Sequence, residues 1–302
     1  MNPLTLIAAV LIFPLFLVVN GMAYEWVDRK LLARMQNRVG PRWFQPLADI
    51  VKLFVKEEVI PEGSNTFLFN LLPVLGLAAV LTAALAVPVL GIGPLLSFPG
   101  DLIVTLYLLS LLTLAAGIAG QNTSSHFAVV GSARLLTQLF AYEAPYLLAL
   151  LGPAFIAGSW QLNEITAANA GTWVLLAQPI GFFVAVMSLM GKLELPPFDA
   201  PEAETEIVAG SLTEYGSFGL ALFMIARKAA LVVSLTLIAA LFMGGIANPL
   251  DYLLKTGALL LVITGVHAIM TRLRIDQTVG LWWRWGMLLM LAQWFLMLLG
   301  GL

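Results

Sequence analysis

Long apolar stretches alternate with short polar segments along the whole chain. Stretches long enough to cross a bilayer, whose apolar core is about 30 Å thick, occur at about 3–23, 68–90, 101–120, 138–158, 172–191, 217–243, 256–270 and 281–300. The seventh stretch is short, so its helix is expected to extend into the flanking residues. The pattern therefore predicts an all-α, polytopic membrane protein with about eight transmembrane helices in a single transmembrane domain, residues 1–302.

Basic residues gather in every second connection between these stretches. The predicted inner loops that carry them are about 24–67, 121–137, 192–216 (the third loop below) and 271–280. By the positive-inside rule these loops face the cytoplasm and both termini lie outside. This predicts a multi-pass protein of the cell's inner (cytoplasmic) membrane.

The first inner loop contains a further helical pattern. In the run FQPLADIVKLFVKEE, apolar residues recur at helical spacing while Asp49 and Lys52 fall elsewhere. This predicts an amphipathic helix at the membrane interface. The pattern does not separate a lipid-binding scaffold helix from one that walls a cavity for a lipophilic substrate.

Composition supports the membrane assignment and limits the chemistry of this chain. Of its residues, 60% are hydrophobic and 11% charged, and there is no cysteine. A disulfide, an iron–sulfur cluster and a cysteine zinc site are therefore excluded, and the two histidines are too separated to suggest a metal set. No basic stripe with interleaved aromatics indicates nucleic acid. Any redox centre is expected on another subunit.

The third loop carries an unusual density of acids. Its run PPFDAPEAETEIVAGSLTEY holds Asp199, Glu202, Glu204, Glu206 and Glu214. Asp199 is predicted to cap a helix beginning at Pro201, in which Glu202 and Glu206 share one face. Coupled carboxylates of this kind suit a proton relay, but an ordinary solvated acidic loop is the alternative.

Three further polar positions fall inside or at the ends of apolar stretches. Glu143 lies about one turn into its stretch beside Tyr142, which indicates either an ion pathway or an acid that reaches back to the interface. Arg227 and Lys228 lie well inside another stretch, where we expect them to pair with the third-loop acids or with Glu143, or to belong to the same buried polar track.

The last inner loop, TRLRIDQT, contributes Arg272, Arg274 and Asp276. Docking of a soluble partner and ordinary positive-inside anchoring are both consistent with these residues.

Several of these motifs together resemble one protein family. DRKLLARMQNRVGPR followed by QPLADIVKLFVKE, then YEAP, the third-loop run and RLRIDQ, are similar to the membrane component of respiratory complex I (NADH dehydrogenase) that is known as its first, or H, subunit. The resemblance covers nearly the full length of the chain.

The resemblance implies a non-catalytic subunit with no cofactor of its own. In that family this subunit links a peripheral arm, whose iron–sulfur and large catalytic subunits carry the redox centres, to antiporter-like membrane subunits. It implies an ion pathway through the third-loop acids, Glu143, Tyr142, Arg227 and Lys228. Docking and coupling to the peripheral arm are expected to use Asp28, Arg29, Arg34, Arg38, Asp49, Lys52, Arg272, Arg274 and Asp276. Lipid is a further partner.

Departures from the complex I pattern favour another branch of the family. Only Trp43 and Phe44 separate GPR from QPLAD, where complex I proteins usually have several more residues, and Asp28 replaces the usual glutamate. Arg227 stands where a further glutamate is common. These features, with MGK and GDL, look more like the energy-converting, membrane-bound hydrogenases and their formate hydrogenlyase relatives. They imply a nickel–iron centre on a partner as one option and argue against a quinone chamber.

Three hypotheses follow from these observations. The first is a coupling subunit that links redox chemistry to H⁺ or Na⁺ translocation, of the ferredoxin-linked hydrogenase type, with a quinone-chamber subunit of an NADH:quinone oxidoreductase as its alternative. The second is a stand-alone ion transporter, and the third a passive membrane anchor for a peripheral enzyme.

Overall fold

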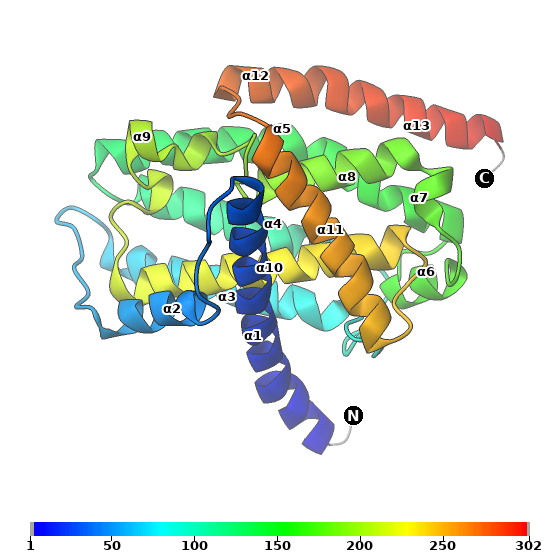
Figure 1. Ribbon diagram of the computed structural model, residues 1–302, viewed down its shortest axis with the longest axis horizontal. Coiled ribbons are helices and arrows are strands. Elements are labelled where there is room, and N and C mark those ends of the chain that lie inside the picture. Colours follow the sequence, from blue (N-terminus) through cyan, green and yellow to red (C-terminus); the bar gives the residue numbers. More distant parts are fainter. Residues whose placement is uncertain (1–2, 301–302) are drawn as a thin grey trace.

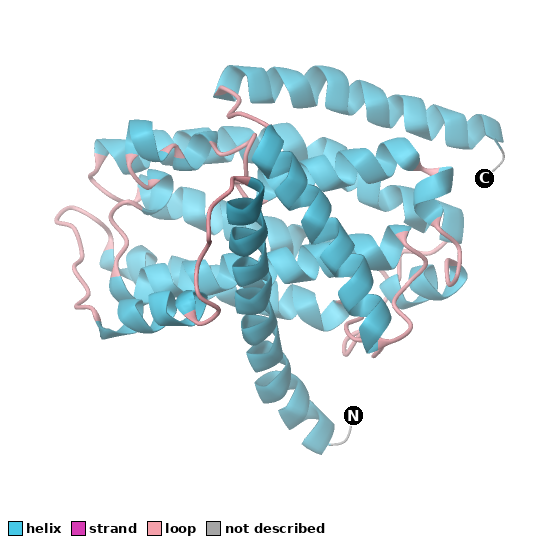
Figure 2. Cartoon of the chain, in the orientation of Figure 1, coloured by secondary structure: helices cyan, strands magenta, loops and turns pink. Residues whose placement is uncertain are grey.

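The structure is a computed structural model that describes residues 3–300, with side chains for residues 12–299. Helices and loops make up this part of the chain, apart from one isolated bridge between Val89 and Ile92 (Figure 2). The longer helices are α1 (Pro3–Met35), α2 (Gln45–Val55), α3 (Thr66–Ala86), α4 (Asp101–Gln121), α5 (His126–Ala157), α8 (Pro179–Lys192), α10 (Ser217–Phe242), α11 (Pro249–Ile269) and α13 (Met287–Gly300). The all-α prediction is confirmed for these residues.

Five helices within the described residues are long and apolar enough to cross a membrane, namely α3, α4, α5, α10 and α11. Each overlaps a predicted stretch, and α11 extends beyond the short seventh stretch as expected. The chain ends, residues 1–2 and 301–302, whose outward location the sequence predicts, lie outside the described residues.

Three predicted stretches differ from the structure. Helix α1 continues to Met35 rather than ending near residue 23, so its last turns occupy the start of the predicted first inner loop. Helix α5 begins at His126 rather than near residue 138, because Gly131 lets its first turns lie directly against the backbone of Gly210 and Ser211. The stretch predicted at 172–191 is divided into α7 (Val174–Ala177) and α8. The division falls at Pro179, which has no N–H with which to continue the helical hydrogen bonds of α7.

Helix α10 is the centre of the bundle. It contacts α1, α2, α3, α4, α5, α8 and α11, and it is the most deeply buried of the five long apolar helices. Figure 1 shows α10 behind α1 and α11, which cross it obliquely. Alanines such as Ala226 and Ala229 are fully buried on α10, and their small side chains allow neighbouring helices to approach closely.

Polar contacts connect α1 to α11 within the bundle. Asn20 donates a hydrogen bond to the Tyr252 hydroxyl at 2.6 Å, and the hydroxyls of Tyr24 and Thr256 lie 2.5 Å apart. Away from water such contacts satisfy groups that would otherwise be costly to bury. They hold the middle of α1 against the bundle.

The third loop is not the single helix that the sequence predicts. It forms η1 (Ala200–Glu202), α9 (Glu204–Ile207) and η2 (Gly210–Leu212), broken by non-helical backbone at Ala203 (φ −47°, ψ 83°) and by the positive φ of 62° at Val208. Glu202 and Glu206 therefore do not share a face. Asp199 makes no side-chain capping bond, because its carboxylate binds Arg272 instead.

Helix α2 lies in the run that carries the amphipathic pattern. Ile50 and Leu53 are buried, while Leu47, Val51 and Phe54 are exposed, and the helix contacts α1 and α10. It lies at the same end of the molecule as α9, whereas α6 (Leu162–Ala168) and α7 lie at the opposite end (Figure 1).

Along one side runs a rod formed by α12 (Ile275–Gly280), the π-helical segment η3 (Leu281–Gly286) and α13 (Figure 1). Trp282 in η3 is buried and its ring lies 5.3 Å from that of Phe198 in the third loop. The rod therefore supports the third loop from the side.

Candidate functional site

Arg227 is the central cation of the site. From α10 its guanidinium binds two carboxylates of the third loop, Glu194 at 2.9 Å and Glu202. Glu194 is almost fully buried, with 5% of its side chain exposed, whereas 40% of the Glu202 side chain is exposed. Burial raises the pKa of Glu194 to about 7, against the lowering effect of Arg227.

A second buried group lies deeper in the bundle and joins α4, α5 and α8. Lys192 Nζ lies 2.7 Å from the Ser110 hydroxyl and 3.6 Å from the Glu143 carboxylate, which also accepts a hydrogen bond from Ser110. Only 3% of the Lys192 side chain is exposed. Its ammonium also lies 5.0 Å from the ring centre of Tyr146 and 5.9 Å from that of Tyr142. This is a charge pair that a membrane interior tolerates only when both partners are present.

A third ion pair joins α1 to α10. Lys228 Nζ lies 2.6 Å from Glu25, and the same carboxylate lies 2.6 Å from Arg29. Arg29 also lies 3.4 Å from Asp49 of α2. Asp28, which is next to Arg29 on α1, accepts a hydrogen bond of 2.5 Å from Thr264 of α11.

Surface ion pairs fasten the third loop to its neighbours. Arg134 of α5 binds Glu206 at 2.8 Å, and Arg272 binds Asp199 at 2.9 Å with Glu206 at 3.7 Å. The hydrogen bond from Arg134 lowers the pKa of Glu206, and the hydrogen bond to Asp199 raises the pKa of Arg272. These pairs are exposed enough to position the loop rather than to contribute much stability.

Two cavities meet at Arg227. The larger, called the charged cavity, has about 420 Å³ and is lined by Glu25, Asp28, Arg29, Leu193, Leu195, Glu202, Glu204, Met224, Arg227, Lys228, Leu231, Leu260 and Ile263. The smaller, called the inner cavity, has about 10 Å³ and is lined by Leu109, Leu112, Thr113, Ala116, Lys192, Leu193, Glu194, Arg227, Ala230 and Ser234. Arg227 and Leu193 line both cavities. Glu202 lies on the charged side of the guanidinium and Glu194 on the inner side.

The charged cavity has a mixed lining, in which Leu193, Leu195, Met224, Leu231, Leu260 and Ile263 are apolar. Here acids and cations such as Glu25, Arg29 and Lys228 stand on several walls. Within the described residues, no group of three or more His, Cys, Asp or Glu is placed to hold a metal ion.

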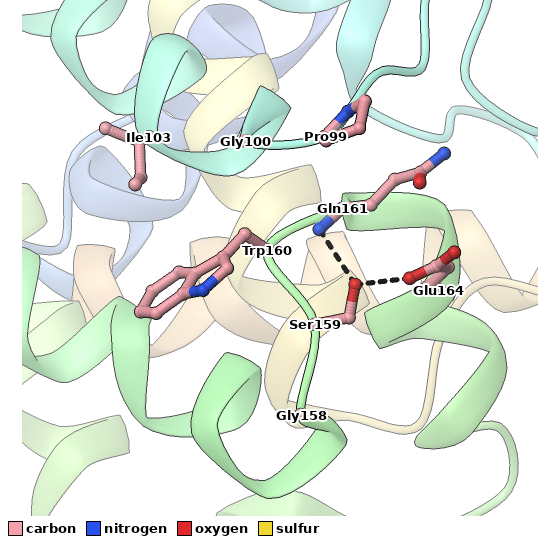
Figure 3. Close-up of a pocket in the computed structure, with 8 residues that line it drawn as sticks. All are labelled: Pro99, Gly100, Ile103, Gly158, Ser159, Trp160, Gln161 and Glu164. Atoms are coloured by element: carbon pink, nitrogen blue, oxygen red, sulfur yellow. Dashed lines mark hydrogen bonds between the residues drawn. The ribbon is translucent and has the colours of Figure 1, made fainter.

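Another hollow lies at the opposite end of the molecule (Figure 3). It has about 510 Å³, and Trp160, Gln161 and Glu164 face it beside Gly100. The Glu164 carboxylate is bound by Ser159, whose hydroxyl accepts the Gln161 backbone N–H at 3.1 Å. No described cation contacts Glu164, so this hollow lacks the paired charges of the other end.

The structure brings together only part of the residue set that the sequence predicts. Arg227, Glu202, Lys228, Asp28 and Arg29 surround the charged cavity, and Asp199, Glu206 and Arg272 form the surface pairs. Glu204 also lines the charged cavity, but neither it nor Glu214 has an ion-pair partner among the described residues, and Arg34, Arg38 and Lys52 are exposed without one. Arg274 and Asp276, 3.5 Å apart, are exposed. Lys228 pairs with Glu25 rather than with the third loop or Glu143, and it lines the charged cavity beside Arg227.

Sequence reasoning does not find four residues of the site. From the sequence Lys192 is only a loop cation, Glu194 lies two residues before the acidic motif, and Glu25 and Ser110 belong to none of the predicted site motifs. The signal that the sequence does offer is a charged residue within or beside an apolar stretch. Glu25 has Arg29 four residues on, and Lys192 and Glu194 border an apolar stretch.

Comparisons with known proteins show what the chain is similar to. The family profile described as NADH dehydrogenase matches residues 7–298. The chain is 32% identical over 289 residues to the H subunit of NADH-quinone oxidoreductase from Dehalococcoides mccartyi, an alignment that covers 92% of this chain and 82% of that protein. It is 31% identical over 300 residues to the protein of the same name from Bacillus mycoides, covering 93% and 90%.

One solved structure has closely similar architecture. A chain of the membrane-bound sulfane sulfur reductase, an archaeal respiratory membrane complex, superimposes with a TM-score of 0.87 at 26% identity. The match covers 95% of this chain and 97% of the other.

Proposed function

This chain belongs to the NADH dehydrogenase family, and we propose that it is the membrane coupling subunit of a complex I-like respiratory assembly. In this role it links redox chemistry in a peripheral arm to translocation of H⁺ or Na⁺, and performs no redox step itself. The partners are the iron–sulfur and large catalytic subunits of that arm, antiporter-like membrane subunits, and lipid.

The observation that carries the proposal is a series of charged groups leading from the third loop into the bundle. It runs from the charged cavity through Arg227 and Glu194 to the inner cavity, and from there through Lys192 to Glu143. Buried charges are costly in a membrane and mark ion pathways. A passive anchor has no need of them.

Within the family, we propose the hydrogenase-type, ferredoxin-linked branch. The charges of the charged cavity, Arg227 among them, argue against a quinone tail. The structural relative is part of a sulfane sulfur reductase. The relatives that are named as parts of NADH-quinone oxidoreductases favour the alternative, a quinone-chamber subunit.

We propose a membrane arrangement that rests on the same family assignment. Helices α1, α8 with α7, and the α12–α13 rod join the five long apolar helices to give eight crossings. The exposed apolar side chains of α2, such as Leu47 and Phe54, face lipid at the interface. The end that holds α2 and α9 faces the cytoplasm, because it carries most of the basic residues.

Glu143→Gln tests the proposal. The glutamine amide keeps the shape of the side chain and can accept the hydrogen bond from Ser110, but it cannot gain or lose a proton. In membrane vesicles containing the whole assembly, we expect redox turnover to persist while ion translocation falls at least tenfold. Wild-type translocation in this variant contradicts the proposal, and substrate movement by the purified chain alone in liposomes favours a stand-alone transporter.

A further inference from the structure

We infer that Glu194 and Lys192, joined by one water molecule bound in the inner cavity, pass protons from the charged cavity to Glu143. This deepens the proposed function, on which it rests, by assigning the proton-carrying groups between the third loop and the bundle interior. Neither residue belongs to the acidic motif of the third loop.

The first support is the position of the inner cavity. Its volume of about 10 Å³ is close to the space that one water requires. Lys192, the last residue of α8, and Glu194, two residues later, both line it, with Thr113 of α4 and Ser234 of α10 on the same walls. A water there has the several polar partners that buried waters normally need.

The second support is the incomplete hydrogen bonding of a group that lines the inner cavity. Glu194 uses Oε1 to bind Arg227, while its buried Oε2 has no hydrogen-bond partner among the described residues. Buried polar atoms are rarely left in this condition without a bound water or a role in chemistry.

The third support is the placement of Lys192 between the two carboxylates. It lines the inner cavity and lies 3.6 Å from Glu143. The Ser110 hydroxyl contacts both Lys192 and Glu143 and keeps the two side chains close together. Lysine is suited to this position because, unlike arginine, it can lose its proton in a buried site.

The transfer is balanced in protons and needs no oxidant or reductant. The Lys192 ammonium gives a proton to the Glu143 carboxylate, so that an N–H bond breaks and an O–H bond forms. The neutral amine then takes a proton from the bridging water, and the water takes the carboxyl proton of Glu194. Glu194 is left as a carboxylate paired with Arg227 and regains a proton from the charged-cavity side, where Glu202 binds the same guanidinium.

The charged groups that face Glu194 are consistent with such cycling. They are Arg227 from α10, Glu202 from η1 and Lys192 from α8, while α4 contributes Thr113 and no charge. Burial and Glu202 favour the protonated form of Glu194, whereas Arg227 favours its carboxylate. Glu194 can therefore exchange a proton near neutral pH.

The test compares variants in the intact assembly, reconstituted in proteoliposomes. Glu194→Gln keeps the side-chain shape without a titrating proton, and Lys192→Arg keeps the positive charge but cannot be deprotonated. We expect both to retain redox turnover and to lose at least tenfold in ions moved per electron, while Glu194→Asp recovers part of the loss. Glu164→Gln, at the far end of the molecule, is the matched control.

The outcomes separate this relay from the proposed function. If Glu143→Gln abolishes translocation while Glu194→Gln or Lys192→Arg moves ions at the wild-type ratio, the relay is wrong and the proposed function stands. If Glu143→Gln also translocates normally, the proposed function fails. A density map of the wild-type assembly that resolves waters gives a check independent of any variant. Water density between Glu194 and Lys192 supports the relay, and a resolved inner cavity without it overturns the relay.

Discussion

At the residue scale, the site depends on a few charges that are buried in pairs. Glu143 with Lys192, and Glu194 with Arg227, place opposite charges where either one alone would be severely destabilising. Removing one partner of a buried pair typically costs about 3–5 kcal/mol. Within each pair, therefore, one partner stabilises the charge of the other. Each pair also keeps a buried carboxyl group that can exchange protons.

Glu194 is predicted to make the assembly's stability depend on pH. Its pKa is about 7 in the folded protein against an ordinary value of 4.5, so the folded state binds the proton more tightly. Stability should then fall as the pH rises between these values, by about 3 kcal/mol at most, since one pKa unit corresponds to about 1.4 kcal/mol.

Thermal denaturation of the purified assembly across this pH range checks the prediction. In Glu194→Gln this contribution should be absent, and the carboxylic-acid infrared band that disappears near pH 7 in the wild type should be missing. An identical pH dependence in the two proteins would assign the effect to another group.

At the element scale, close crossings of helices determine which charges meet. At Gly21 of α1, an added Cβ would lie 2.9 Å from the carbonyl carbon and oxygen of Lys228 in α10. This close approach brings Glu25, one turn later on α1, to the Lys228 ammonium. The Glu25–Lys228 pair therefore depends on a glycine at the crossing.

Gly21→Ala is predicted to destabilise the bundle by about 1–3 kcal/mol, the usual cost of overpacking. The matched control is Gly257→Ala on α11, where no heavy atom lies within 4 Å of the added Cβ. There the change should be neutral or slightly stabilising, because alanine favours helix. Denaturation midpoints of the two purified variants decide the matter, and equal midpoints would refute a tight α1–α10 crossing.

The sequence predicts the helices well because their cause is local. Hydropathy locates α3, α4, α10 and α11, and the spacing of apolar residues locates α2. It does not predict that Arg227 binds Glu194, or that Lys192 reaches Glu143, because these contacts depend on how distant helices are rotated and crossed. The sequence also does not predict the break in the third loop, because the ion pairs of Arg227 with Glu202 and of Arg134 with Glu206 are tertiary contacts.

At the scale of the whole molecule, charge is distributed unequally between the two ends. The end with α2 and α9 carries the paired acids and cations, and the end with α6 and α7 has few charges (Figure 1). A coupling subunit needs this asymmetry, because its soluble partner acts from one side only. The proposed cytoplasmic location of the charged end can be tested directly.

The absence of native cysteine makes single-cysteine labelling straightforward. Arg38→Cys and Glu62→Cys are predicted to react with a membrane-impermeant maleimide only from the cytoplasmic side, and Gly93→Cys only from the outside. All three positions are exposed. Labelling intact cells and inverted vesicles, with or without the partner subunits bound, measures sidedness. The reverse pattern would contradict the proposed orientation.

Coupling must also operate in reverse, because the same groups connect ion movement and redox chemistry in both directions. The most direct measurement is electron flow in proteoliposomes of the whole assembly while an ion gradient is imposed. We predict that the gradient slows forward turnover and drives electrons backwards in the wild type and in Glu164→Gln, and that Glu143→Gln loses this response. Electron flow that ignores the gradient in the wild type, or responds to it fully in Glu143→Gln, would contradict a coupling role for this chain.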